Sequence, residues 1–349
     1  MPIRKGELLD HFILLQETVE AMGAEAILSL RNFFIFIRAP RRNLVLYPQF
    51  LVEVDGVRQY TLDFSARARR FIGWLPYYNK RWEMACDKLL FKAWASSHGI
   101  ATPGHALAQD LAEKELGDFL VKQRRSSFGL GIRGPFHGAA LGSLQLEEDE
   151  YAEQFVFGKS LKIWYWDGTP VCMEIDTMPT VTGDGQASIR VLLERRLSDL
   201  KRGKGRHPDA ADTPPSDFSG IEQYLAYAGC ALDTVLPYGT RQTVDLRYGT
   251  PYMLPAFRKT LDLKRRMPDD LREQLLDIGR ASWSCIPEEV QAGTAYTVDA
   301  ILAGDRTIRV LEMNSNPFLH PLLYRCMIPA YLSKPLATDE AQAHETNLH

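Results

Sequence analysis

The alternation of apolar and polar positions predicts one helix and several strands in the first 80 residues. Residues 6–22 repeat apolar side chains at helical spacing, and Gly23 follows as a stop signal. The repeat consists of Leu8, Leu9, Phe12, Leu15, Val19 and Met22. Strand-like apolar runs follow between residues 33 and 64, and the last of them resembles a hairpin that turns at Asp55-Gly56. We therefore expect a small α/β unit up to about residue 80, in which we find no catalytic motif.

The next apolar pattern predicts a helix over Arg81–His98, which ends at Gly99, and then a strand over Phe119–Gln123. Lys122 lies inside this apolar strand. Burying an unpaired charge is costly, so a lysine at this position needs a partner or a ligand. Lys122 is therefore a candidate functional residue.

A glycine-rich loop follows this strand, with glycines at 129, 131 and 134. Glycine lets the backbone pass close to a ligand, and backbone N–H groups can surround phosphate oxygens. The loop lacks the spacing of a P-loop and of a dinucleotide-binding turn. By itself, a glycine-rich loop is more often a simple turn.

The stretch from Thr294 to Pro321 predicts a second hairpin, with its turn at Gly304-Asp305. A two-residue turn there would place Asp299 opposite Val310. Side chains alternate between the two faces of a strand. We therefore expect Asp299 to share a face with the apolar Ile301 and Ile308.

On the same face, Glu312 and Asn314 would follow two and four residues beyond Val310. Two carboxylates and an amide oxygen form a hard-oxygen ligand set, which suits Mg²⁺ better than zinc. The alternative is a hairpin with polar residues at its edge. The spacing alone leaves both interpretations open.

Composition excludes several classes of function. The chain has 349 residues and a net charge of −3, so no strong positive field indicates nucleic-acid binding. Five cysteines stand singly, without a C-x-x-C pair, which indicates neither a zinc site nor a disulfide framework and fits a reducing cytoplasm. The N-terminal stretch lacks the apolar core of a signal peptide, and no apolar run approaches the ~20 residues that span a bilayer. We expect a cytoplasmic protein that binds neither nucleic acid nor membrane.

Several segments in a fixed order resemble the ATP-grasp superfamily. They are D-K-L-L-F-K-A-W-A-S-S-H-G-I-A-T-P (87–103), F-L-V-K (119–122), S-S-F-G-L-G-I (126–132), E-Q-F-V-F-G-K-S-L-K (153–162), V-D (298–299) and L-E-M-N-S-N-P (311–317). The chain is similar to D-alanine–D-alanine ligase. It is more similar to the ATP-grasp part of cyanophycin synthetase and to glutathione-type ligases, through T-V-T-G-D-G-Q-A-S-I-R-V-L-L-E (180–194) and V-D-L-R (244–247). The resemblance covers residues 81–321.

The resemblance implies roles for individual residues. Lys88 and Lys122 would reach the ATP phosphates, although Lys88 can equally be a solvated helix lysine. The flexible loop over the phosphates would contain Ser126, Ser127, Phe128 and Gly129. Glu153, Gln154 and Val156 would form the adenine hinge, unless they belong to a plain half-buried strand, and Ile301 would pack against the nucleotide. Asp299, Glu312 and Asn314 would hold two Mg²⁺ ions, with Mn²⁺ as a substitute.

The chain departs from the family pattern on the side of the substrates. Ser160 stands where the family usually has an acidic residue for the ribose hydroxyls, and a hydroxyl makes a weaker contact there. Lys162 replaces an arginine and loses its bidentate geometry. Arg247 is the candidate for stabilising an oxyanion, and Arg190 for binding a substrate carboxylate. The basic run Lys201–Arg206 and the polar stretch after it read as a solvated loop, or as a lid that meets an anion.

The resemblance implies an α/β (α+β) ATP-grasp fold with three domains. An N-terminal domain would cover residues 1–80, a central lid subdomain 81–157 and a C-terminal subdomain with the metal site 158–333, followed by a tail at 334–349. It implies an ADP-forming ligase that joins a small carboxylate to an amine through an acyl phosphate, and a homodimer is one arrangement we consider. A kinase of the same superfamily and a nucleotide-binding module without turnover are the alternatives.

Overall fold

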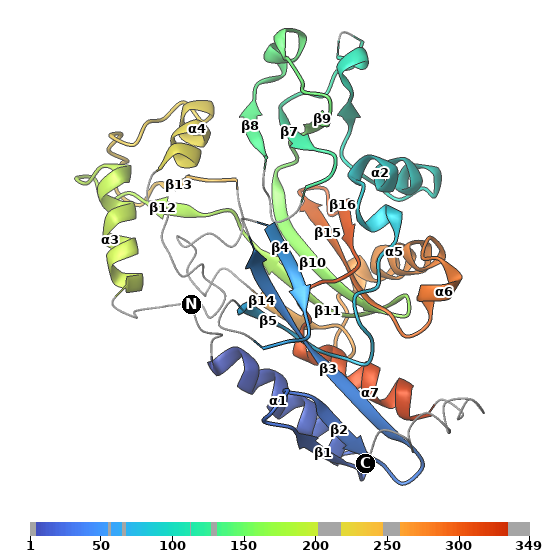
Figure 1. Ribbon diagram of the computed structural model, residues 1–349. Coiled ribbons are helices and arrows are strands. Elements are labelled where there is room, and N and C mark those ends of the chain that lie inside the picture. The colour runs from blue at the N-terminus through green and yellow to red at the C-terminus, as the bar shows by residue number, and fades with distance from the viewer. Residues whose placement is uncertain are drawn as a thin grey trace.

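A computed structural model describes residues 5–54, 57–64, 68–111, 113–126, 131–201, 218–246 and 259–333. The chain forms a mixed α/β molecule with a large central sheet, an N-terminal unit below it and a smaller sheet above it (Figure 1). A fourth group of elements, α3, α4, β12 and β13, lies to one side. The mixed α/β fold expected from the sequence is confirmed.

The N-terminal unit is a five-stranded antiparallel sheet covered by α1 and α7. Its elements are α1 (Lys5–Glu20), β1 (Glu25–Leu28), β2 (Ile35–Arg38), β3 (Asn43–Val54), β4 (Val57–Thr61), β5 (Ala68–Leu75) and α7 (Tyr324–Ser333). Its apolar core continues through Leu319 and Tyr324 to Trp164 of the central sheet. The N-terminal unit therefore packs against the central sheet without a break, and a domain boundary at residue 80 stays a prediction.

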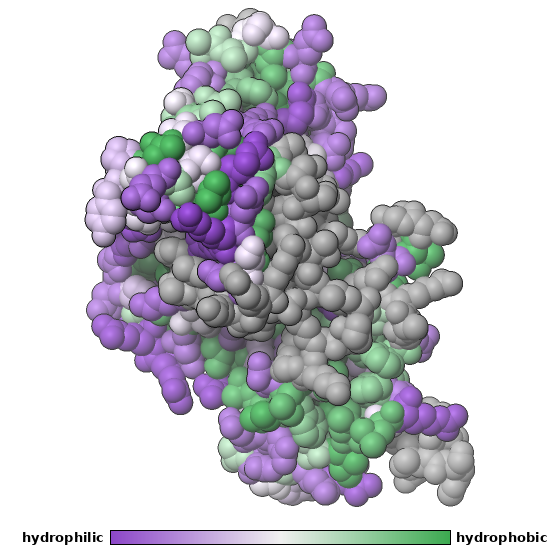
Figure 2. All heavy atoms as spheres, turned by 90° about the vertical axis from the view of Figure 1, so that its left-hand side faces the viewer, coloured by the Kyte–Doolittle hydropathy of each residue, from purple (hydrophilic) through white to green (hydrophobic). Residues whose placement is uncertain are grey.

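Close packing fixes this junction at Gly73 of β5. A Cβ atom at Gly73 would lie 2.7 Å from Cβ of Leu319, and its φ of +145° is a conformation that side-chain-bearing residues rarely adopt. On the outer side, Leu9 and Ile13 of α1 are 53% and 45% exposed. Figure 2 shows an apolar area in its lower part, at the height of the N-terminal unit in Figure 1. The homodimer stays a prediction.

The central sheet is antiparallel, with the order β14-β11-β10-β15-β16. Its elements are β10 (Gly158–Trp166), β11 (Thr169–Asp176), β14 (Lys259–Asp262), β15 (Ala295–Ala303) and β16 (Ile308–Asn314). Helices α2 (Lys88–Ser97), α5 (Arg272–Ser284) and α6 (Glu288–Gln291) lie beside it, and apolar residues of α2 and α5 bury one face. The opposite face packs through Trp164 and Trp166 against the N-terminal unit, and its remaining part carries polar side chains.

The upper sheet has the order β6-β9-β7-β8, and the lateral lobe pairs β12 with β13. Their elements are β6 (His105–Ala106), β7 (Phe119–Gln123), β8 (Arg133–Phe136), β9 (Glu150–Gln154), β12 (Thr180–Thr182), α3 (Ile189–Lys201), α4 (Ser219–Tyr227) and β13 (Arg241–Thr243). The lobe contacts the upper sheet where the Tyr227 hydroxyl donates to Asp118 Oδ2 at 2.6 Å and the Tyr227 ring stacks on His137. The remaining helices of the described residues are short 3₁₀ turns at Glu83–Ala85, Ala108–Asp110, Gly138–Ser143, Asp269–Leu271 and Pro321–Leu323.

Most predicted elements are present, and one helix differs from its prediction. The helix predicted over Arg81–His98 is divided into a 3₁₀ turn and α2, because Asp87 caps the new helix by accepting from the N–H groups of Leu89 and Leu90. The loop stretch 202–217 lies outside the described residues. Among the described helices, none is long and apolar enough to cross a membrane.

Candidate active site on the central sheet

The β15–β16 hairpin presents Asp299 and Glu312 side by side. Asp299 pairs directly with Glu312, and Thr297 with Asn314, so all three predicted metal ligands face the same side of the sheet. Lys162 of the neighbouring β10 lies opposite Asp299. The row Lys162–Asp299–Glu312 thus crosses three adjacent strands on the face that the helices leave open.

The predicted register of this hairpin is wrong by one residue at its start. The turn is longer than two residues, since Ala303 N–H donates to the Thr307 carbonyl and the first pair is Leu302 with Ile308. Val310 therefore pairs with Ala300 instead of Asp299, and Ile308 lies on the buried face. A β-bulge at Leu311 then inserts one residue and turns Glu312 towards Asp299.

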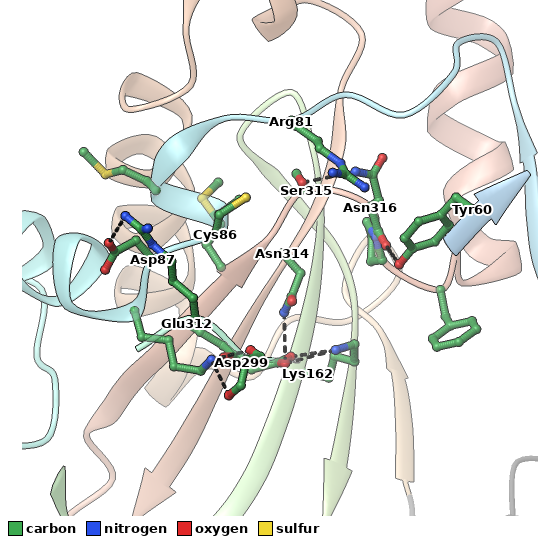
Figure 3. A pocket seen from close by; sticks show the side chains of 18 of the residues that line it. Tyr60, Arg81, Cys86, Asp87, Lys162, Asp299, Glu312, Asn314, Ser315 and Asn316 are labelled. Carbon is green, nitrogen blue, oxygen red and sulfur yellow. Dashed lines mark hydrogen bonds and ion pairs between the residues drawn. The ribbon is translucent and has the colours of Figure 1, made fainter. Parts of the chain in front are cut away.

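The acidic residues of the row are held by lysines (Figure 3). Lys162 Nζ lies 2.8 and 3.1 Å from the two carboxylate oxygens of Asp299, and Asn314 Nδ2 donates to Asp299 Oδ2 at 3.1 Å. Lys88 Nζ lies 3.3 Å from Glu312 Oε2. Burial alone would lower the pKa of Lys162, but Asp299 and then Glu312 outweigh it and raise that pKa. Lys162 therefore stays charged.

These side chains fit a divalent cation that prefers oxygen. Asp299, Glu312 and the amide oxygen of Asn314 come from two adjacent strands, and both carboxylates are partly exposed to a cavity. Lys162 and Lys88 now neutralise these carboxylates, as a bound cation would. No described group of three His, Cys, Asp or Glu residues could hold a metal, so the described side chains offer no nitrogen or sulfur set of that kind. The oxygen ligands suit Mg²⁺, and its binding at this site stays a prediction.

Lys88 connects this row to the predicted phosphate loop. It stands in the first turn of α2, and its Nζ contacts the Ser126 carbonyl oxygen and lies 3.3 Å from Ser126 Oγ. Asp87 holds the preceding loop residue Arg124 through a 2.7 Å ion pair. The position of Lys88 therefore depends on both α2 and the loop. Ser127, Phe128 and Gly129 lie outside the described residues.

A second charged cluster occupies the predicted adenine hinge. Glu153 is 1% exposed, and its two carboxylate oxygens pair with Lys122 and, at 2.6 Å, with Lys92. Burial alone would raise the pKa of Glu153, but Lys122 and Lys92 outweigh it and lower that pKa to about 2. The Tyr151 hydroxyl also donates to Glu153 at 3.3 Å. The partner that Lys122 was expected to need is thus Glu153.

Lys92 is the residue of this cluster that the sequence reasoning missed. It is fully buried, and its Nζ also donates to Thr102 Oγ1 at 3.0 Å, which in turn donates to the Val310 carbonyl. Lys92 therefore joins α2, the hinge strand and the central sheet. The sequence feature that could have identified Lys92 is its position beside Phe91 and one turn from Ala95, on the buried face of the helix.

The other predicted nucleotide residues lie along the segment from β9 to β10. Gln154 N–H donates to the Gly104 carbonyl at 2.8 Å, and Val156 lies between the two strands. Ser160 pairs in the sheet with Ile301, which is 7% exposed. A Cβ at Gly158 would lie 2.3 Å from the Leu302 carbonyl oxygen, so only glycine lets this segment approach β15. The contacts of these residues with a nucleotide stay predictions.

Two predicted substrate residues are not found at this site. Arg190 lies in α3, where it pairs with Glu222 at 3.7 Å and Asp233 at 3.6 Å, and it does not line the cavity described below. Arg247 lies outside the described residues. Both assignments stay predictions.

A cavity of about 780 Å³ lies between the polar face of the central sheet and the N-terminal sheet. Lys88, Lys162 and the three predicted metal ligands line it from one side. Tyr60 and Glu53 reach it from the N-terminal sheet, and Arg81 and Arg125 line it as well. The sequence reasoning did not identify these four residues, because no local motif marks them.

The class of protein that this site indicates can now be compared with known proteins. No family model matches the chain. The resemblance to ATP-grasp ligases that the ordered motifs indicate is nevertheless confirmed. The bifunctional glutathione biosynthesis protein GshAB of Streptococcus thermophilus is 24% identical over 221 residues, which cover 59% of this chain and 27% of that protein. The chain thus matches about a quarter of the length of this curated relative.

Solved structures give similar results. A bifunctional glutathione synthetase from Pasteurella multocida aligns over 93% of this chain and 43% of its own, with 16% identity and a TM-score of 0.42. D-cycloserine synthetase DcsG aligns over 72% and 71%, with 13% identity and a TM-score of 0.39. D-alanine–D-alanine ligase from Bacillus anthracis aligns over 71% and 62%, with 13% identity and a TM-score of 0.36.

Proposed function

We propose that this protein is an ADP-forming carboxylate–amine ligase that acts on amino acids or small peptides. The observation that carries the proposal is the row Lys162–Asp299–Glu312, with Asn314 beside it, open to a large cavity. The hinge cluster around Glu153 stands next to this row, because Lys92 and Thr102 connect it to β16. The likeness to the bifunctional glutathione biosynthesis protein supports the same reaction class.

Binding of the nucleotide would use the two charged clusters differently. Lys122, held by Glu153, would face the adenine side and the phosphates, while Lys88 and Lys162 would meet the phosphates from the central sheet. Asp299, Glu312 and Asn314 would hold Mg²⁺, which supplies positive charge to the phosphate oxygens. Once their carboxylates have another partner, Lys88 and Lys162 are free to donate to anionic oxygens.

The reaction would proceed in two displacements. A carboxylate oxygen of the first substrate attacks the γ-phosphorus, the bond to the β-phosphate oxygen breaks, and ADP leaves with that electron pair. The amine nitrogen of the second substrate then attacks the acyl carbon, loses a proton and expels inorganic phosphate, which leaves an amide. Positioning and charge neutralisation are the main catalytic requirements of phosphoryl transfer. The lysines of the site meet the second requirement.

Phosphate release from Mg-ATP tests the proposal. The protein is incubated with pooled amino acids and dipeptides, and products are identified by mass spectrometry. We expect ADP and phosphate only when an acid and an amine are both present, and a product lighter by one water than their sum. Hydroxylamine should trap the acyl phosphate when the amine is withheld, and Lys122→Ala should abolish turnover.

Other products would change the assignment. A stable phosphorylated product without condensation would indicate a kinase. AMP and pyrophosphate would contradict the proposed reaction type. Mg-ATP binding without turnover on any acid and amine pair would indicate a binding module.

A further inference from the structure

Arg81 is a cation on the cavity wall that lacks an ion pair within the described part of the chain. It precedes the 3₁₀ turn Glu83–Ala85 and is exposed. Two other arginines, Arg124 and Arg125, both form ion pairs with Asp87, at 2.7 and 3.4 Å. A guanidinium stays protonated and presents a planar set of donors that matches a carboxylate. Arg81 is therefore available to an anionic ligand.

The surroundings of Arg81 are held by hydrogen bonds among themselves. The Tyr60 hydroxyl donates to the Asn316 carbonyl at 3.0 Å, and Asn316 Nδ2 donates to the Lys80 carbonyl at 2.7 Å and lies 3.2 Å from Ser315 Oγ. Figure 3 shows Arg81, Ser315, Asn316 and Tyr60 together at one end of the cavity. The arrangement joins the N-terminal sheet to the end of β16 and gives Arg81 a fixed polar wall.

The opposite end of the cavity holds Asp299, Glu312 and Lys162 (Figure 3). In the proposed ligase reaction, the carboxylate that reacts must lie there, beside the γ-phosphate. An anion bound at Arg81 is therefore a second group that does not react. The amine must approach the acyl carbon from the side that the leaving phosphate does not occupy, which leaves the Arg81 end for the amine substrate.

We propose that Arg81 binds the free carboxylate of the amine substrate, and that this substrate is therefore an amino acid or a short peptide with a free carboxyl end. The inference rests on the proposed ligase function and adds the chemical class of its second substrate. Glu53 lines the same cavity from β3, is exposed and has no described ion pair, so its negative charge favours a substrate that carries an amine. The two side chains together suit a zwitterion.

Ligand-observed NMR on the full chain tests this inference without turnover. The protein is saturated with Mg²⁺ and a non-hydrolysable ATP analogue, and is offered a pool of amino acids and dipeptides or the same compounds as C-terminal amides. We expect carboxylates to bind and their amides to bind at least about ten-fold more weakly, as for the loss of a charge-assisted hydrogen bond. Arg81→Gln should weaken carboxylate binding about ten- to hundred-fold and leave affinity for the nucleotide unchanged. Arg272→Gln, an exposed arginine of α5, serves as the matched control and should bind like the wild type.

Three results would overturn the subsite: amides that bind as well as carboxylates, a pool in which nothing binds, or an Arg81→Gln variant that loses the nucleotide instead. The phosphate-release assay separates this failure from that of the ligase proposal. ADP-forming condensation with amines that lack a carboxylate would keep the ligase and remove the subsite. Arg81-dependent binding of amino acids without any condensation would keep the subsite and remove the ligase.

Discussion

The two lysine–carboxylate clusters use the same chemistry in different surroundings. In the hinge cluster, the side chains of Lys92 and Glu153 are 0% and 2% exposed. In the row on the central sheet, the side chains of Lys162 and Asp299 are 31% and 25% exposed. Water and ligands can reach the second pair but not the first.

This difference in exposure determines what each ion pair can do. A buried pair cannot be separated cheaply, because each charge would stay in a poorly polarisable interior. A partly exposed pair contributes little to stability and exchanges partners readily. The hinge cluster is therefore a permanent part of the fold, whereas the row on the sheet is suited to exchange its lysines for a metal ion and phosphates.

The strongest way to break this comparison is to remove one lysine from each cluster. Lys92→Met should lower the free energy of unfolding by about 1–3 kcal/mol, because Glu153 loses one buried partner and keeps Lys122. Lys162→Met should lower it by about 1 kcal/mol or less, because Asp299 remains accessible to water. Urea unfolding of both variants measures the difference. The dependence of the unfolding free energy on urea concentration should be the same in both. Equal losses would show that burial does not separate the two clusters.

A second test addresses the exchange of partners at the central sheet. Glu312→Gln and Asp299→Asn should weaken Mg²⁺-dependent ATP binding by at least about ten- to hundred-fold, since each removes a predicted metal ligand. Mutation of a residue that only supports a metal ligand already lowers metal affinity by about that factor. Their stability should stay within about 1 kcal/mol of the wild type. Calorimetry measures the affinity, with Glu288→Gln on the surface of α6 as the control. Undiminished binding in both variants would remove the metal assignment.

The smallest expected effect is the acid dependence of the buried cluster. The folded-state pKa of Glu153, about 2, lies below its ordinary value of 4.5. Its stabilising contribution is therefore fully present above pH 4.5 and is lost as the pH falls towards 2. By pH 3 the wild type should lose about 2 kcal/mol relative to the double variant Lys92→Met/Glu153→Gln, which lacks the carboxylate.

Comparison with the double variant removes the contributions of other acid-sensitive groups, of which His11 is one. Burial, and then the charge of His320, lower the pKa of His11 to about 3, so the folded state also loses stability through His11 as the pH falls below 6.5. His11 is present in both proteins, and its contribution cancels in the difference. Parallel stability curves between pH 5 and 3 would contradict the lowered pKa of Glu153.

The sequence by itself predicted part of the candidate site and the order of its elements. Asp299, Glu312 and Asn314 follow from the alternation of side chains along two strands, and Lys122 follows from the cost of an unpaired charge in an apolar strand. These inferences depend on local spacing, which a sequence displays directly. The resemblance to ATP-grasp ligases came from the order of such local motifs and is confirmed.

Only the tertiary structure decided how these residues meet. The turn is longer than two residues and shifts the register by one, and the bulge at Leu311 returns Glu312 and Asn314 to the face of Asp299; no residue type specifies such a bulge. Lys92 pairs with Glu153 from 61 positions away, and Arg81 reaches the cavity because the N-terminal sheet packs against the end of β16. Contacts between distant segments depend on how whole sheets and helices pack, and a local pattern carries no record of that packing.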